Sequence, residues 1–292
     1  MLSPYLFNII AEMTMREALE NFRGGFKIGG RTVNNLRYAD DIVLITTTPA
    51  ELQALLNRIR IAGTKYGLVI NKGKTKVMAT EGDNTVITVD GDALQQVDHF
   101  QYLGALITED GRCESDIRTR LGMAKSILTE LEHIWKSRAI TTCTKLRLLR
   151  SLVWPVGTYG AESWSFGKWE QQKLQSFETI CYRRVMRIPW TARRRNEDIL
   201  EEVGGRKLWS SVISRKLRYF GHIMRKEDDN LEKCIITGMV EGSRGRGRPR
   251  RAWCDDIKDW THLSTDELLQ STKDRAGWRS LVCRAANVCT SE

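Results

Sequence analysis

Two adjacent carboxylates, Asp40 and Asp41, lie within the apolar stretch LRYADDIVLI and are the residues best placed to do chemistry. Asp is common in turns because its side chain bonds its own backbone, so an Asp-Asp turn needs no function. At a hairpin tip supported by apolar strands, the same pair would offer the oxygen ligands that Mg²⁺ prefers. Two such ions can hold the attacking and leaving oxygens of a phosphoryl transfer. These residues alone leave both interpretations open.

A second candidate site is the basic stretch CYRRVMRIPWTARRR, in which Tyr182 and Trp190 are interleaved with arginines and no acid intervenes. Arg pairs bidentately with phosphate and stacks on bases. The stretch therefore indicates nucleic-acid contact, although a basic helix face can also be merely solvated. The arginines concerned are Arg183, Arg184, Arg187, Arg193, Arg194 and Arg195.

The Gly/Arg stretch RGRGRPRR is too poor in apolar residues to pack and resembles the core of an AT-hook. An extended backbone of this kind lets Arg enter a narrow minor groove. An RNA-binding linker and an ordinary basic loop are the alternatives. Its candidate contact residues are Arg244, Arg246, Arg248 and Arg250.

The composition of the 292 residues agrees with a nucleic-acid partner without requiring one. The formal charge is +10, and residues 151–292 hold most of it, with 26 Lys and Arg against 19 Asp and Glu. A basic excess favours a polyanionic partner. The seven cysteines are scattered singly, which argues against a disulfide framework or a zinc site. Without a membrane-spanning run or signal peptide, we expect an intracellular protein of the nucleus, the cytoplasm or both.

The elements around Asp40 and Asp41 predict an α+β region over the first 110 residues or so. Apolar spacing predicts a helix from Ser3 to Gly24, extended chain over 26–37, and a buried strand over Ile42–Thr47. A capping box at Thr48 begins a second helix that ends near Gly63 or Gly67. The following segments predict two short strands in GLVINKGKTKVMAT, an Asp-Gly hairpin in TVITVDGDAL, and an aromatic strand in HFQYLGALIT.

From Asp116 onward the pattern becomes helical, so the boundary between the two regions lies near 111–115. A long amphipathic helix begins at Asp116, and a second helix over Thr142–Val153 stops before Pro155. Shorter helices are predicted over 168–187, 196–203, 206–224, 252–261 and 275–288. Those over 196–203 and 206–224 could form a helix-turn-helix, and the tryptophans other than Trp190 are expected in the core.

The YADD segment followed by an apolar strand resembles the polymerase motif of reverse transcriptases. LSPYLFNIIAEM, GLVINKGKTKVM and FQYLGALIT resemble its neighbouring motifs in order and spacing. The combination is similar to the reverse transcriptase of non-LTR (LINE-type) retrotransposons. LVWPVGTYGAESW, RRNEDIL, LRYFGHIMR and GRPRRAWCDDI resemble the C-terminal region of animal endonuclease–reverse transcriptase elements, so the resemblance covers essentially the whole chain.

The resemblance implies an RNA-directed DNA polymerase, a nucleotidyltransferase that uses Mg²⁺, dNTPs, an RNA template and a DNA primer or target. It implies that Asp40 is a metal ligand, with Asp41 as its supporting neighbour, and that Lys74 lies near the triphosphate. Lys72 and Lys76 are expected to be solvated turn lysines. The primer-grip hairpin would comprise Phe100, Tyr102, Leu103 and Gly104.

By the same resemblance, residues 1–110 are a partial palm, 111–165 a helical thumb, and 166–292 a basic helical region with an Arg/Gly-rich linker over 241–251. The family's further metal-binding Asp, on an upstream palm strand, has no match in this sequence, nor have the fingers or the endonuclease. We therefore expect the chain alone to be inactive as a polymerase. The alternatives are a domesticated, non-enzymatic nucleic-acid or chromatin binder and a non-functional remnant that still folds.

Overall fold

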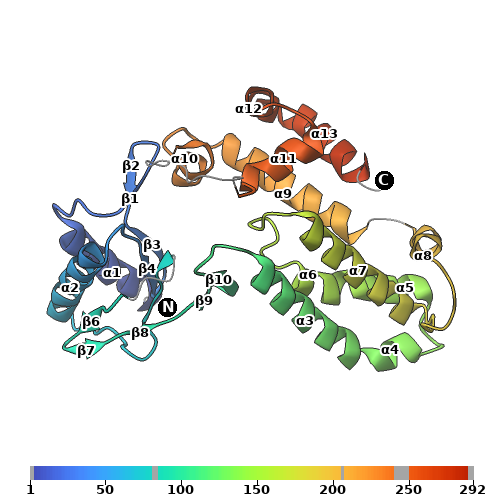
Figure 1. The fold of residues 1–292 in the computed structure, drawn as a ribbon, viewed down its shortest axis with the longest axis horizontal. Helices are drawn as coiled ribbons and strands as arrows, with labels where there is room; N and C mark the ends of the chain where they lie inside the picture. The colour runs from blue at the N-terminus through green and yellow to red at the C-terminus, as the bar shows by residue number, and fades with distance from the viewer. Residues whose placement is uncertain (1–2, 81–84, 205–206, 240–249, 289–292) are drawn as a thin grey trace. The chain divides into compact units, whose positions relative to one another are not determined.

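The computed structural model describes residues 3–80, 85–204, 207–239 and 250–288, which divide into two compact units (Figure 1). The first unit combines Met1–Gln101, Thr108–Gly111 and Asp228–Arg246, and the second combines Tyr102–Ile107, Arg112–Glu227 and Gly247–Glu292. In the described residues, the first unit mixes helices with short strands and the second is almost entirely helical. The predicted α+β class is confirmed.

Two clusters of buried apolar side chains hold the first unit together. Helix α1 (Ser3–Leu19) contacts α2 (Pro49–Lys65), which begins as predicted at Thr48, whose hydroxyl accepts a hydrogen bond of 3.2 Å from the amide of Glu51. One face of α2 packs on α1 and the other packs on short strands, so α2 is the centre of this unit. The two clusters comprise Met15, Ala18, Leu55, Ile59 and Ala62 on one side, and Leu56, Val77, Ile87, Val89 and Leu94 on the other.

The strands of the first unit pair only two at a time. Antiparallel pairs join β1 (Phe26–Ile28) to β2 (Arg31–Val33), β3 (Asn35–Tyr38) to β4 (Asp41–Leu44), and β6 (Thr88–Val89) to β7 (Asp92–Ala93). A parallel pair joins β5 (Lys76–Val77) to β8 (Gln95–Gln96). The predicted strand before the basic turn of GLVINKGKTKVMAT does not form. Val69 there is 87% exposed, so no packing compensates for ordering an extended chain.

Helix α10 (Leu231–Thr237) belongs to the first unit although it lies late in the sequence (Figure 1). The amide of Gly29 donates to the carbonyl of Met239 at 2.9 Å, and the thiol of Cys234 donates to the carbonyl of Ile28 at 3.2 Å. This helix was not predicted, because none of its residues is buried and it carries no apolar periodicity.

The second unit is built around helix α9 (Leu208–Met224), which is buried along most of its length. Its exposed positions, which include Arg215, Arg218 and His222, lie along one face of the helix, and the helix-turn-helix interpretation stays a prediction. The other elements are α3 (Glu114–Glu130), α4 (Glu132–Lys136), α5 (Thr142–Leu148), α6 (Trp154–Gly157), α7 (Lys168–Val185), α8 (Asn196–Val203), α11 (Trp253–Thr261), α12 (Thr265–Lys273) and α13 (Arg275–Val288).

The prediction that the helix stops before Pro155 is wrong, because the helical path continues through Pro155 into α6. The turn before it, η2 (Leu149–Val153), is a π-helical turn. Pro has no amide hydrogen and its ring clashes with the carbonyl four residues earlier in an α-helix. A wider π-turn at this point lets the helical path continue.

Helix α12 was also not predicted, although Ser264 and Glu267 form a capping box at its start. In the described part of the chain, no helix is long and apolar enough to cross a membrane.

Candidate functional site

Asp40 and Asp41 lie at the tip of the β3–β4 hairpin. Tyr38 pairs with Asp41, so Ala39 and Asp40 form a two-residue turn. Ala39 has φ 53°, while Asp40 is not among the residues with positive φ, which is the backbone pattern of a type II′ turn. A side chain at positive φ is strained, because glycine alone enters this region freely. Both carboxylates are exposed, and no hydrogen bond or ion pair holds either one within the described residues.

The base of this hairpin is fixed more firmly than its tip. Leu44 packs against both hydrophobic clusters of the first unit. Arg37, just before the turn, donates to Glu12 of α1 at 2.7 Å, and Arg16 donates to the same carboxyl at 2.8 Å. The bond from Arg16, followed by that from Arg37, lowers the pKa of Glu12. The tip therefore projects from a supported base.

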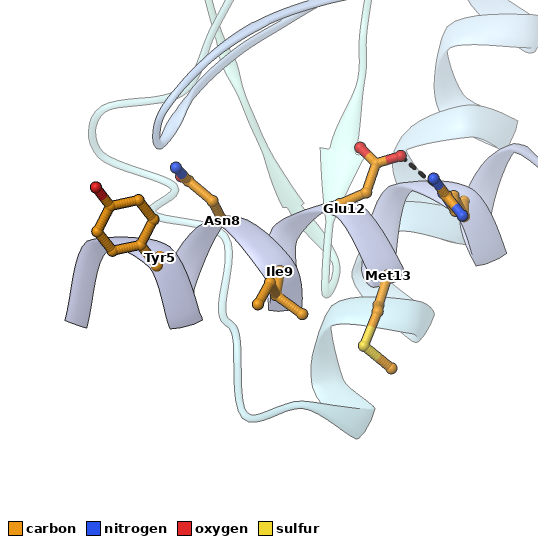
Figure 2. Close-up of a pocket in the computed structure, with 6 residues that line it drawn as sticks. Tyr5, Asn8, Ile9, Glu12 and Met13 are labelled. Carbon is orange, nitrogen blue, oxygen red and sulfur yellow. Dashed lines mark hydrogen bonds and ion pairs between the residues drawn. The ribbon is translucent and has the colours of Figure 1, made fainter. Parts of the chain in front are cut away.

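The expectation of a buried strand over Ile42–Thr47 is wrong. Strand β4 ends at Leu44, and Ile42 is 40% exposed because a two-stranded sheet has only one side against the core. An exposed apolar face also runs along α1, where Tyr5, Ile9 and Met13 line a shallow groove of about 430 Å³ (Figure 2). Glu12 lies on the same helix, lines this groove and forms an ion pair with Arg37.

The hairpin carboxylates fit part of a site for a hard divalent cation. Two exposed, unpaired carboxylates at one turn supply oxygen ligands, and Mg²⁺ tolerates water in its remaining positions. Within the described ranges, no group of three or more His, Cys, Asp or Glu side chains is arranged to hold a metal ion. The pair therefore matches the chemistry of a cation ligand but forms only part of a coordination shell.

The three lysines after α2 have different environments. Lys72 pairs with Asp92 at 2.7 Å, and Lys76 donates to Gln95 at 2.5 Å. Both bonds lie at the surface, so these lysines are solvated as expected and are also bonded to the small strands. Lys74 is exposed in the turn, its own amide bonds Asn71, and its ammonium makes no contact among the described residues. No hydrogen bond or ion pair joins Lys74 to the β3–β4 hairpin.

The predicted primer-grip residues lie in a hairpin formed by β9 (His99–Tyr102) and β10 (Ala105–Thr108). Leu103 and Gly104 form its turn with φ 48° and 81°, the two positive values of a type I′ turn. Phe100 is 37% exposed and Leu103 is 42% exposed. Leu103 is thus a non-glycine residue held in the left-handed backbone region, which costs free energy.

Side chains of the helical unit fix the tip of this second hairpin. The hydroxyl of Tyr159 donates to the carbonyl of Leu103 at 3.1 Å, and Arg120 donates to the carbonyl of Gly104. The buried carboxyl of Asp116 accepts from the amide of Leu106 at 3.0 Å and from the indole of Trp164 at 2.8 Å. These residues were not predicted because their contacts join separate elements, from 10 to 56 residues apart in the sequence.

The arginines of the 183–195 stretch differ in whether an acidic side chain pairs with them. Arg184 pairs with Glu132 at 2.7 Å, Arg194 pairs with Glu202, and Arg195 lies 3.7 Å from Asp198. Arg183 bonds backbone and Asn196 and lies beside Trp190. Arg187 and Arg193 are exposed, with no acidic partner in the described chain.

Tyr182 is not part of that surface. It is 1% exposed, donates to Glu178 at 3.0 Å and packs against Trp154. Its suggested place among the nucleic-acid contacts is therefore wrong. Of the second basic stretch, Arg244, Arg246 and Arg248 lie outside the described residues, and Arg250 is exposed.

Known proteins resemble this chain at two levels. A family model described as "Reverse transcriptase (RNA-dependent DNA polymerase)" matches residues 1–107, the part that carries both hairpins. A transposon-derived protein of Caenorhabditis elegans is 30% identical over 276 residues, which are 88% of this chain and 98% of that protein. The likeness to the worm protein thus covers both units.

Two Pol polyproteins also match. That of the type-1 retrotransposable element R2 of Nasonia vitripennis is 32% identical over 124 residues, 38% of this chain. That of the type-2 element R2DM of Drosophila melanogaster is 28% identical over 148 residues, 47% of this chain. The matched parts amount to 12% and 13% of these polyproteins.

None of these similarities favours the non-enzymatic nucleic-acid binder. The carboxylate hairpin, the family match over residues 1–107 and the transposon-derived relatives agree with one another. The chain belongs to the reverse transcriptase family of non-LTR retrotransposons.

Proposed function

We propose that this chain supplies the carboxylate hairpin, the second hairpin and the helical support of an RNA-directed DNA polymerase. In this proposal residues 1–110 correspond to part of the palm, 111–165 to the thumb and 166–292 to a basic C-terminal region. The observation that carries it is the exposed, unpaired Asp40–Asp41 pair on a hairpin whose base is packed into the core. Family membership implies a divalent metal and binding of template and primer.

Each proposed role follows from how its residue is held. Asp40 lies in the turn and is the metal ligand, and Asp41 begins β4 and adds a second negative charge beside it. A divalent cation, when bound, would neutralise charge on phosphate oxygens and orient them; we propose Mg²⁺ because carboxylate oxygens suit it. Lys74, with its ammonium unpaired, would stabilise a triphosphate.

The second hairpin is proposed to position the primer strand through residues 100–104. Tyr159 and Arg120 bond the two carbonyls at its turn, so the helical region fixes the tip. This coupling suits a hairpin that must hold a strand end in one place, because misplacement of about 1 Å reduces catalysis strongly.

Metal binding by the purified chain tests the proposal directly. Mn²⁺ titration followed by electron paramagnetic resonance should detect a weak site, because two carboxylates leave most ligand positions to water. Asp40→Asn should abolish it, and Asp41→Asn should weaken it. Glu201→Gln, which removes an exposed acid of α8, is the control and should leave binding unchanged. Equal binding by Asp40→Asn and the unmodified chain would refute the proposed ligand.

Primer extension with an RNA template, dNTPs and Mg²⁺ tests the activity of the chain alone. We expect no extension, because the described residues offer two metal-binding carboxylates and the polymerase chemistry implied by the family uses more. Extension that disappears in Asp40→Asn would contradict this expectation and would assign catalysis to this chain.

A further inference from the structure

We propose that the loop between α7 and α8, residues 186–195, binds unpaired nucleotides of a single nucleic-acid strand. Trp190 would stack on a base, and Arg187 and Arg193 would contact phosphates on either side of it. This loop lies in the helical unit and shares no residue with the carboxylate hairpin. Figure 1 shows it at the margin of that unit, between the end of α7 and α8.

Trp190 is unusually exposed for a tryptophan of this unit. Its side chain is 85% exposed, whereas five other tryptophans of the unit are at most 6% exposed. An indole left in water forfeits the free energy that burial would give, so such exposure marks a binding surface more than a packing element. The buried tryptophans are Trp135, Trp154, Trp164, Trp209 and Trp278.

Hydrogen bonds already fix the shape of the loop. The guanidinium of Arg183 lies 5.6 Å from the ring centroid of Trp190 and donates to the carbonyl of Arg194 at 2.6 Å. Arg183 also bonds Asn196 at the start of α8, and the amide of Ile188 bonds the carbonyl of Arg183 at 2.9 Å. Arg183 thus joins both ends of the loop. A preformed loop loses little entropy when it binds.

The uncompensated positive charge of the loop lies on both sides of Trp190. Arg184, Arg194 and Arg195 have carboxylate neighbours, so their charges are largely compensated. Arg187 and Arg193 are exposed, have no acidic partner in the described residues, and stand three positions before and after Trp190. Basic side chains on both sides of an aromatic ring match a strand whose bases stack while its phosphates pass by.

The neighbouring helix favours a single strand over a duplex. Helix α8 carries the exposed acids Glu197 and Glu201, in addition to the two that pair with arginines, and these would repel the many phosphates of a broad duplex footprint. In a duplex the base faces are stacked and unavailable to Trp190, whereas an unpaired base offers a free face. The loop therefore fits a short single-stranded segment.

Binding of labelled oligonucleotides of about ten nucleotides across a salt series tests the proposal. Poly-uridine RNA, poly-thymidine DNA and a duplex of equal length are compared on the full chain. Trp190→Ala should weaken single-strand binding about 5- to 150-fold, with the salt slope unchanged and duplex binding hardly affected. Trp190→Phe should retain most of the affinity, because it keeps a stacking ring.

The double variant Arg187→Ala/Arg193→Ala should lower the single-strand salt slope by about 1.4, at about 0.7 per phosphate contact. The double variant Arg184→Ala/Arg194→Ala is the matched control, with the same charge change at arginines that have carboxylate partners. Its slope should change by much less. Circular dichroism confirms that each variant folds.

Three results would overturn the proposal. The first is that Trp190→Ala leaves the affinity for single strands unchanged. The second is that Trp190→Ala lowers the affinity for single strands and for the duplex equally. The third is that the two double arginine variants change the salt slope equally. A preference between the RNA and DNA oligonucleotides would identify which kind of nucleic acid the loop binds. The expected effect of Trp190→Ala is the same for either kind. None of these measurements depends on metal binding or on polymerase activity, so failure here and failure of the carboxylate site are distinguishable.

Discussion

Carboxyl groups of this chain serve different purposes according to their burial. Asp40 and Asp41 are exposed and have no partner among the residues that the structure describes, which leaves their oxygens available to a cation. Asp116 and Glu178 are 4% and 2% exposed, and both accept hydrogen bonds from backbone amides. A buried carboxylate needs such donors because water no longer solvates its charge. Exposure, more than residue type, therefore separates candidate ligands from structural acids.

Glu178 should make the stability of the protein depend on pH. Burial raises the pKa of its carboxyl, and the bonds from the Leu208 amide at 2.8 Å and the Tyr182 hydroxyl at 3.0 Å only partly oppose this. The folded state then binds this proton more tightly than the unfolded state. Its stabilising contribution is present at acid pH, below the ordinary value near 4.5, and is lost as the pH rises through the raised pKa.

Glu178→Gln removes that titration and keeps an oxygen that can accept both bonds. We expect the free energy of unfolding of the unmodified protein, minus that of the variant, to fall as the pH rises from about 4.5 toward 8. Urea unfolding of both proteins across this range measures the difference. Parallel pH profiles would contradict the argument, since all other titrating groups are shared.

At the scale of elements, the sequence predicted those whose signal is local. The helix from Thr48 and the helix over 196–203 were predicted correctly because a cap or an apolar stripe lies in the segment itself. The continuation of the helix past Pro155 and the absence of a strand around Val69 were not predicted. Both depend on whether other parts of the chain pack against the segment. Periodicity cannot show such contacts.

The candidate sites follow the same rule. The turn at Asp40 was predictable from two acids between apolar segments, and the structure places both at the tip. The burial of Tyr182 and the anchoring of the second hairpin by Asp116 and Tyr159 were not. Each depends on residues far apart in the sequence that the fold brings into contact.

Helix α10 and the β1–β2 turn should be close enough to cross-link. A Cβ atom built on Gly29 lies 3.1 Å from the sulfur of Cys234, which is the separation that a disulfide requires. Gly29→Cys should therefore form a disulfide with Cys234 on mild oxidation, seen as a faster band on a non-reducing gel and confirmed by mass spectrometry.

Gly30→Cys is the matched control for this cross-link. It also stands at positive φ, but a Cβ there has no neighbour within 4 Å. It should stay reduced under the same conditions. Equal oxidation of both variants would mean that α10 does not pack against this turn.

At the scale of the molecule, the two units are not successive along the chain. The first unit includes α10, and the second includes the tip of the β9–β10 hairpin, so each takes a segment from beyond the sequence boundary predicted near 111–115. Cutting the chain at that boundary would deprive the first unit of α10. The C-terminal helices are in turn bound to α9 through the buried Trp278 of α13, which packs against Phe220, and through a buried ion pair.

That pair joins Lys216 of α9 to Asp256 of α11, both with side chains 0% exposed. Lys216 also donates to the carbonyl of Trp164 at 2.7 Å and lies 4.7 Å from the ring centroid of Trp253. Asp256 accepts further bonds from the amide of Phe166 at 3.0 Å and from Arg251 at 2.9 Å. Desolvation lowers the pKa of Lys216, which shows that its charge needs these partners.

Asp256→Ala should destabilise the helical unit by about 3–5 kcal/mol, because it leaves the Lys216 ammonium buried without a counter-charge. Adding Lys216→Met should recover much of that loss, since an apolar side chain of similar length needs no partner. Urea unfolding followed by tryptophan fluorescence measures both variants. Lys136→Ala, which breaks a surface pair with Glu132, is the control and should have a much smaller effect. A double variant no more stable than Asp256→Ala would contradict this explanation and would assign the loss to the other bonds of Asp256, from Phe166 and Arg251.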